Sequence, residues 1–108
     1  MSNTRIASFR VIAKGANCYL LRILGELDTS TRSLALDAVR AVPTDAEEIA
    51  IDLASVSFMN LGGLRSLIEA VAGARQRECR VWVEDPGPAR RLTALAGLDD
   101  ALAFGKRP

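Results

Sequence analysis

The sequence predicts an α/β domain in which helices cover a mixed β-sheet, with the elements in the order β-β-α-β-α-β-α. Residues 6–13 mix apolar and polar residues, whereas residues 18–27 are strongly apolar and rich in β-forming residues. Only a short turn separates the two segments, which indicates an antiparallel hairpin. In the rest of the chain, strand-like segments alternate with segments of helical spacing, which indicates parallel strands joined by helical crossovers. At 108 residues the chain is long enough for one core, so we expect a single domain over residues 1–108.

The hairpin is followed by a helix and a third strand. Asp28 begins a cluster of capping residues, DTST, in front of a helical pattern that Pro43 ends. Apolar residues recur in that pattern at the spacing of one helix face: Leu34, Ala38 and Ala41. Residues 49–53 (IAIDL) then predict a short apolar strand, and residues 55–59 an extended or irregular link.

The second half of the chain continues this alternation. From Leu64 the apolar residues follow helical spacing, and residues 80–84 (RVWVE) alternate as a strand. Pro88 suits the first turn of a last helix, which we expect Gly97 to end in a left-handed conformation. The tail, residues 101–108, predicts a short strand or helix.

Composition and charge argue against several classes of function. Fourteen basic and thirteen acidic residues leave a formal charge of +1, so no broad field favours nucleic acid or an anionic membrane. The sequence contains no histidine, which removes the usual general base of a triad and the commonest nitrogen ligand of metals. Cys18 and Cys79 have no C-x-x-C partner, so we expect two small buried residues, and a redox-sensing disulfide stays open. We therefore expect no metal, no cofactor and no enzymatic activity.

Membrane and export signals are also missing from the sequence. No apolar run approaches the ~20 residues that a membrane span needs, and the N-terminus MSNTRIASFR lacks the apolar core of a signal peptide. These observations predict a cytoplasmic protein that does not insert into a membrane.

The segment SVSFMNLGGLRSL, residues 55–67, joins the third strand to the second helix. Asn60 is a good N-cap residue, and Gly62 and Gly63 suit a helix start whose backbone is closely approached. Leu61 is unexpected there, because a polar residue is usual at such a position. A nucleotide- or anion-binding role would rest on these residues alone, and the missing lysine and incomplete glycine loop separate them from a P-loop.

Three stretches of the sequence resemble the STAS domain, the fold of bacterial anti-sigma factor antagonists. They are GELD at residues 25–28, IDLASVSFMNLGGL at residues 51–64 and EDPGPARRLTALAGLD at residues 84–99. Together they span nearly the whole chain in the family's order and spacing. The resemblance implies a STAS-like fold and a domain that binds an anti-sigma factor of the serine kinase type and so frees a sigma factor.

In that family the second helix commonly begins Asp-Ser-Ser-Gly-Leu, and the kinase phosphorylates the first serine. Matched to this pattern, Asn60 stands at the aspartate, Leu61 at the phosphoacceptor and Gly62 at the second serine. Gly63 and Leu64 match the family's own Gly-Leu. The resemblance therefore implies an antagonist that phosphorylation at the usual position cannot switch, because Leu61 has no hydroxyl.

The role of Leu61 depends on whether it is buried. Packed against Phe58 or Met59, it would be the remnant of a lost switch; exposed, it would be an apolar anchor that makes binding constitutive. The sequence leaves both interpretations open. Ser66 is expected near the helix surface, as a polar surface residue rather than a replacement phosphoacceptor.

The expected partner-binding surface joins the start of the second helix to the end of the second strand. Asp28 borders this surface by resemblance, although capping the following helix is a sufficient reason for its presence. The expected surface residues are Asp28, Asn60, Leu61, Gly62, Gly63 and Arg65. An alternative function is a STAS-like accessory subunit of a transport ATPase or of another multi-protein assembly, and self-association is left open.

Overall fold

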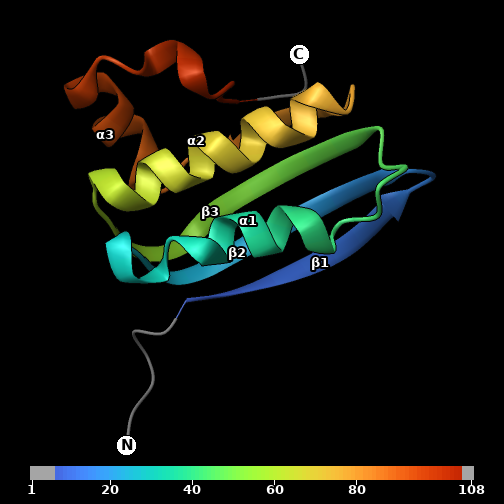
Figure 1. Ribbon diagram of the computed structural model, residues 1–108, viewed down its shortest axis with the longest axis horizontal. Helices are drawn as coiled ribbons and strands as arrows, with labels where there is room; N and C mark the ends of the chain where they lie inside the picture. Colours follow the sequence, from blue (N-terminus) through green and yellow to red (C-terminus); the bar gives the residue numbers. More distant parts are fainter. Residues whose placement is uncertain (1–6, 106–108) are drawn as a thin grey trace, which may run out of the picture.

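Four strands form one sheet in the order β1-β2-β3-β4 in the computed structural model, which describes residues 7–105 (Figure 1). The strands are β1 (Ser8–Gly15), β2 (Cys18–Leu27), β3 (Glu48–Met59) and β4 (Arg80–Asp85). β1 and β2 are antiparallel, whereas β2, β3 and β4 run parallel. The predicted hairpin and mixed sheet are confirmed, although Ile6 and residues 106–108 of the predicted elements lie outside the described residues.

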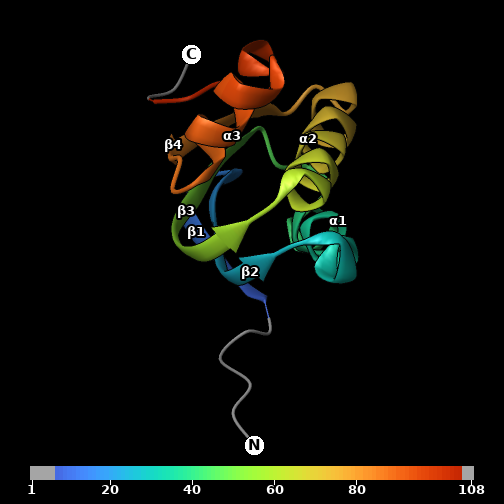
Figure 2. The same cartoon turned by 90° about the vertical axis from the view of Figure 1, so that its left-hand side faces the viewer.

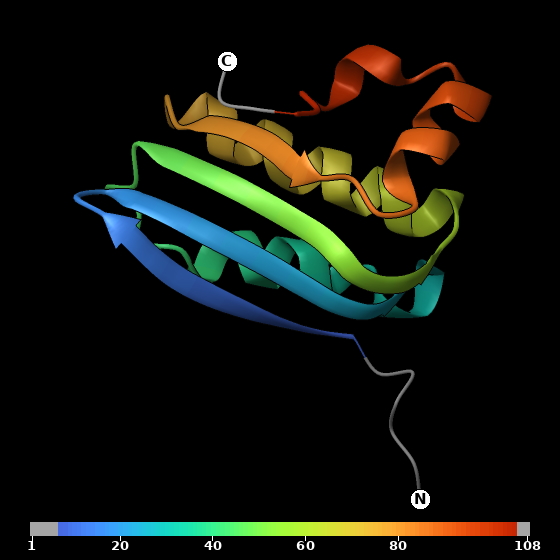
Figure 3. The same ribbon diagram turned by 180° about the vertical axis from the view of Figure 1, so that it is seen from behind.

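Helices α1 and α2 lie side by side on one face of the sheet (Figures 1 and 2). The helices are α1 (Ser33–Ala41), α2 (Leu61–Gln76) and α3 (Ala89–Ala96), with short 3₁₀ helices η1 (Thr29–Thr31) and η2 (Asp99–Ala101). α3 lies toward the β4 edge, where Phe104 forms a single parallel bridge with Val83. None of the described helices lies over the opposite face of the sheet (Figure 3), where Leu20, Ala50 and Trp82 form a second, smaller buried cluster. The predicted α/β class and element order are confirmed.

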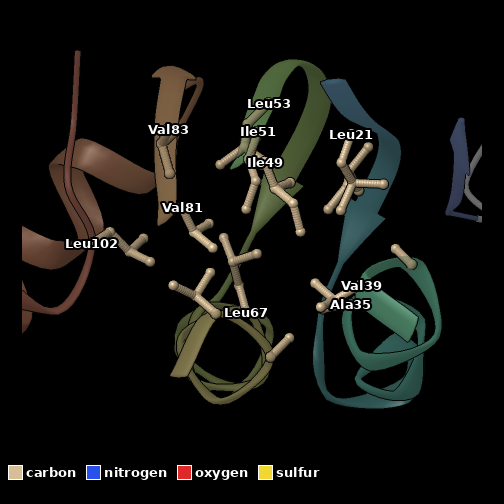
Figure 4. Packing of buried hydrophobic residues seen from close by; sticks show 14 of the residues in the cluster. Leu21, Ala35, Val39, Ile49, Ile51, Leu53, Leu67, Val81, Val83 and Leu102 are labelled. Carbon is tan, nitrogen blue, oxygen red and sulfur yellow. The ribbon is translucent and has the colours of Figure 1, made fainter. Parts of the chain in front are cut away.

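The hydrophobic core lies between the sheet and the pair of helices α1 and α2 (Figure 4). Burying a side chain the size of leucine or isoleucine contributes about 1.5–3 kcal/mol, so this layer fixes the two helices against the sheet. The largest fully buried side chains come from strands and helices alike and include Leu21, Ile49, Ile51, Leu53, Leu64, Leu67 and Val83.

Of the two alternatives predicted for residues 55–59, an extended or an irregular link, the extended one is confirmed, because β3 continues to Met59 and is longer than the predicted strand at residues 49–53. The end of β3 pairs with β2 through a ladder whose register shifts twice, between Arg22 and Leu24 and between Gly25 and Glu26. Each shift disturbs the alternation of side chains between the two faces. The period of two that identifies a strand is therefore lost from this part of the sequence.

Two local predictions can be compared with the structure directly. Gly97 has φ 71° and ends α3 in the left-handed conformation, as predicted. Neither Cys18 nor Cys79 forms a disulfide within the described residues; Cys79 is buried, as expected, whereas the expectation of burial is wrong for Cys18, which is partly exposed. Burial raises the pKa of the Cys79 thiol. Within residues 7–105, no helix combines the length and apolarity that crossing a membrane requires.

Candidate protein-binding site

Asn60 fixes the junction between β3 and α2 with three hydrogen bonds. Its side-chain Oδ1 accepts the N–H of Gly63 at 3.0 Å, and its carbonyl accepts the N–H of Leu64 at 2.9 Å. Its own N–H donates to the carbonyl of Leu27, the last residue of β2, at 3.1 Å. The predicted N-cap is confirmed, and α2 consequently begins at Leu61, earlier than the apolar spacing predicts.

Gly62 and Gly63 lie against other parts of the same chain. A Cβ placed on Gly63 would be 2.1 Å from the carbonyl oxygen of Leu27, and one placed on Gly62 would be 2.3 Å from Oγ1 of Thr29. Both distances are far below van der Waals contact. The close approach that the glycines permit is therefore internal, and it allows the first turn of α2 to rest on the end of β2 and on η1.

Two large apolar side chains are exposed beside this junction. Leu61 is 40% exposed and Phe58 is 47% exposed. This exposure favours the interpretation of Leu61 as an apolar anchor. The sequence alone does not predict that Phe58 is exposed. Val56 is buried, and strict alternation along the strand would bury Phe58 on the same face. The β2–β3 ladder breaks that alternation, because Gly25 pairs with Val56 and the next residue, Glu26, pairs with Phe58, which leaves one extra residue in β3.

Asp28 caps η1, which leads directly into α1. Its Oδ1 accepts the backbone N–H groups of Ser30 and Thr31 at 2.9 and 3.1 Å, and the hydroxyl of Ser30 at 2.6 Å. In return, the N–H of Asp28 donates to Oγ1 of Thr31, which completes a capping box. The hydrogen bond from the Ser30 hydroxyl, with those from the backbone, holds the pKa of Asp28 below its ordinary value.

A groove of about 480 Å³ runs between α1 and α2 next to the junction. Its walls come from η1, α1 and α2: Thr29, Arg32, Ser33, Leu36, Gly62, Arg65, Ser66 and Glu69. Ser66 is only 9% exposed, and its hydroxyl donates to the carbonyl of Gly62 at 2.9 Å, so the expectation of a surface serine is wrong.

The structure gathers the predicted residues at one end of the molecule, where β2 and β3 end and α2 begins (Figure 1). They do not all face outward. Leu61 and Arg65 are exposed, whereas Gly63 is buried beneath Leu27 and serves the junction. Among the described residues, no three His, Cys, Asp or Glu side chains gather into a group that could hold a metal ion.

Comparison with known proteins identifies the family. A family model described as "Mlab, STAS domain" matches residues 11–104. The chain belongs to the STAS domain family. None of the curated proteins matches it.

Solved structures agree with this assignment. The chain is 27% identical to an anti-sigma factor antagonist from Mycobacterium paratuberculosis, with a TM-score of 0.72, covering 97% of this chain and 90% of that one. The phosphorylated form of the Bacillus cell fate determinant SpoIIAA shares the fold, with a TM-score of 0.65, 17% identity and 92% of each chain covered. The protein TM1081 also shares it, with a TM-score of 0.70, 14% identity, and 92% of this chain and 79% of that one covered. Family and fold together support a regulatory role through protein binding.

The packing of Gly63 generates a prediction about stability. Gly63→Ala places a methyl group against the backbone of Leu27, and we expect a loss of about 1–3 kcal/mol in the free energy of unfolding. Gly73 is the matched control, because a Cβ there meets nothing within 4 Å beyond its sequence neighbours and the backbone of its own helix. Gly73→Ala should stabilise the protein by about 0.5–1 kcal/mol through helix propensity. Urea unfolding measures both, and equal effects of the two substitutions would contradict this packing.

The lowered pKa of Asp28 generates a second prediction. A carboxyl whose folded pKa is depressed adds stability above its ordinary pKa of 3.8, and this contribution is lost as the pH falls through the folded value. Between about pH 5 and pH 3, wild-type stability should therefore fall further than that of Asp28→Asn. Urea unfolding at a series of pH values tests this, with Asp37→Asn on the exposed face of α1 as the control. Parallel curves for wild type and Asp28→Asn would contradict it.

Proposed function

We propose that this domain is an anti-sigma factor antagonist that binds an anti-sigma factor of the serine kinase type and so frees a sigma factor. We further propose that phosphorylation at the family's usual position does not switch it. The observation that carries the proposal is the exposure of Leu61 on the first turn of α2, in a STAS fold similar to an antagonist. Such a partner would be met in the cytoplasm.

The apolar character of the junction supports a protein partner. Leu61 and Phe58 are exposed at a fixed, well-capped end of the domain, and large apolar side chains of this kind dominate the binding energy of many interfaces. Since β3 and α2 are both anchored in the core, the two side chains are presented on a rigid support. Little conformational entropy is lost when a partner covers such a support.

The chemistry of the helix start supports a contact without a phosphate switch. A phosphate group adds a charge of about −1.5 to −2, which a partner pocket shaped for an apolar side chain would reject. Leu61 has no oxygen to receive one. Ser66, the serine in the first turns of α2, is buried with its hydroxyl bonded to Gly62, which argues against it as a substitute.

The accessory subunit of a transport ATPase or of another assembly is the second candidate. A permanent subunit contact needs no covalent off signal, so an exposed leucine at the front of α2 suits it equally well. This candidate predicts that the domain co-purifies with a membrane-associated ATPase, whereas the first predicts a complex with an anti-sigma kinase.

Binding to purified kinase-type anti-sigma factors of the source genome tests the proposal. We expect one of them to be retained by the immobilised domain, and Leu61→Asp to weaken that complex at least tenfold, because a charge replaces the apolar contact. Leu95→Asp is the matched control, since Leu95 is 75% exposed but belongs to α3. Retention of no kinase, or equal effects of Leu61→Asp and Leu95→Asp, would contradict the proposal.

A further inference from the structure

The groove between α1 and α2 combines two positive side chains from different elements. Arg32 precedes the first turn of α1, and Arg65 lies in the second turn of α2; both are exposed and both line the groove. We propose that the groove receives an acidic side chain of the partner, held between Arg32 and Arg65. This inference rests on the proposed function, because the groove adjoins the junction that presents Leu61.

The two arginines differ from those that serve the fold. Arg22 pairs with Asp52 at 3.1 Å, and Arg80 pairs with the buried carboxylate of Glu48. Within residues 7–105, the guanidinium groups of Arg32 and Arg65 form neither an ion pair nor a hydrogen bond. An arriving carboxylate would therefore not have to displace a described internal partner of either group.

The backbone adds to the positive character of this end of the groove. The start of α2, capped by the neutral Asn60, lies here, and a helix N-terminus carries partial positive charge that favours anions, whereas the carboxylate of Asp28 already caps the N–H groups at the start of η1. Arg32 at the N-cap of α1 has a helical backbone (φ −59°, ψ −29°), so α1 follows directly from η1, whose own start is capped by Asp28. The hydroxyls of Thr29 and Ser33 supply further donors at the same wall.

The opposite charge at the other end of the groove defines where the acidic group sits. Glu69 lies one turn beyond Arg65 on α2 and lines the same groove. Its carboxylate would repel an acid placed deeper, so the favourable position is near Gly62 and close to Leu61. The partner surface that fits has an apolar pocket for Leu61 and, beside it, an aspartate or glutamate that enters the groove.

Charge reversal on the intact domain tests this inference with the kinase-type anti-sigma factor that the domain retains. We expect Arg32→Glu and Arg65→Glu each to raise Kd roughly tenfold or more, and added salt to weaken the wild-type complex more than either variant. Arg91→Glu on α3 makes the same change of charge at an exposed site away from the groove, and its Kd should stay within about twofold of the wild type. Thermal unfolding of each variant controls for folding.

The two proposals fail in different ways. If the kinase binds and the groove variants behave like Arg91→Glu, the acidic contact is wrong while the proposed function stands. If no kinase-type factor binds wild type, the proposed function is wrong and this inference falls with it. Recovery of Arg65→Glu binding by an acid-to-arginine change on the kinase would identify the contacting residue directly.

Discussion

The start of α2 rests on a contact that only a residue without a side chain permits. The backbone of Gly63 lies so close to the carbonyl of Leu27 that any Cβ would overlap it. Asn60 secures the same contact from the other side, because its N–H bonds to Leu27 and its side chain caps Gly63. The end of β2, the end of β3 and the front of α2 therefore form one rigid corner, and this corner fixes the positions of Phe58 and Leu61.

The rigid corner explains how an apolar residue comes to be displayed at a helix start. The inward positions of the first turns of α2 are taken by Gly63, Leu64 and Leu67, which are all buried. Helical geometry then turns Leu61 and Arg65 outward together, since they are separated by about one turn. An apolar contact and a positive charge are thus offered side by side, which suits a protein partner with a pocket and a neighbouring acid.

The features that depend on neighbouring residues in the sequence could be predicted from it, whereas those that depend on the pairing or packing of two elements could not. The hairpin, the N-cap at Asn60 and the left-handed cap at Gly97 each have a local chemical cause that a sequence displays. The end of β3 and the exposure of Phe58 depend on register shifts against β2, which are a property of two strands and are absent from either segment alone. The groove likewise required the packing of α1 on α2, so Arg32 could not be associated with Arg65 beforehand.

Leu61 leaves the first turn of α2 without the hydroxyl that a phosphate switch needs, and restoring that hydroxyl gives the most direct test. Wild type and Leu61→Ser are each incubated with the kinase-type anti-sigma factor and ATP, and the affinity and the mass of each domain are measured before and after. We expect wild type to stay unmodified and bound, and Leu61→Ser to gain a phosphate on the new hydroxyl and to dissociate. A wild-type domain that gains a phosphate in α2 and leaves the kinase would contradict the account.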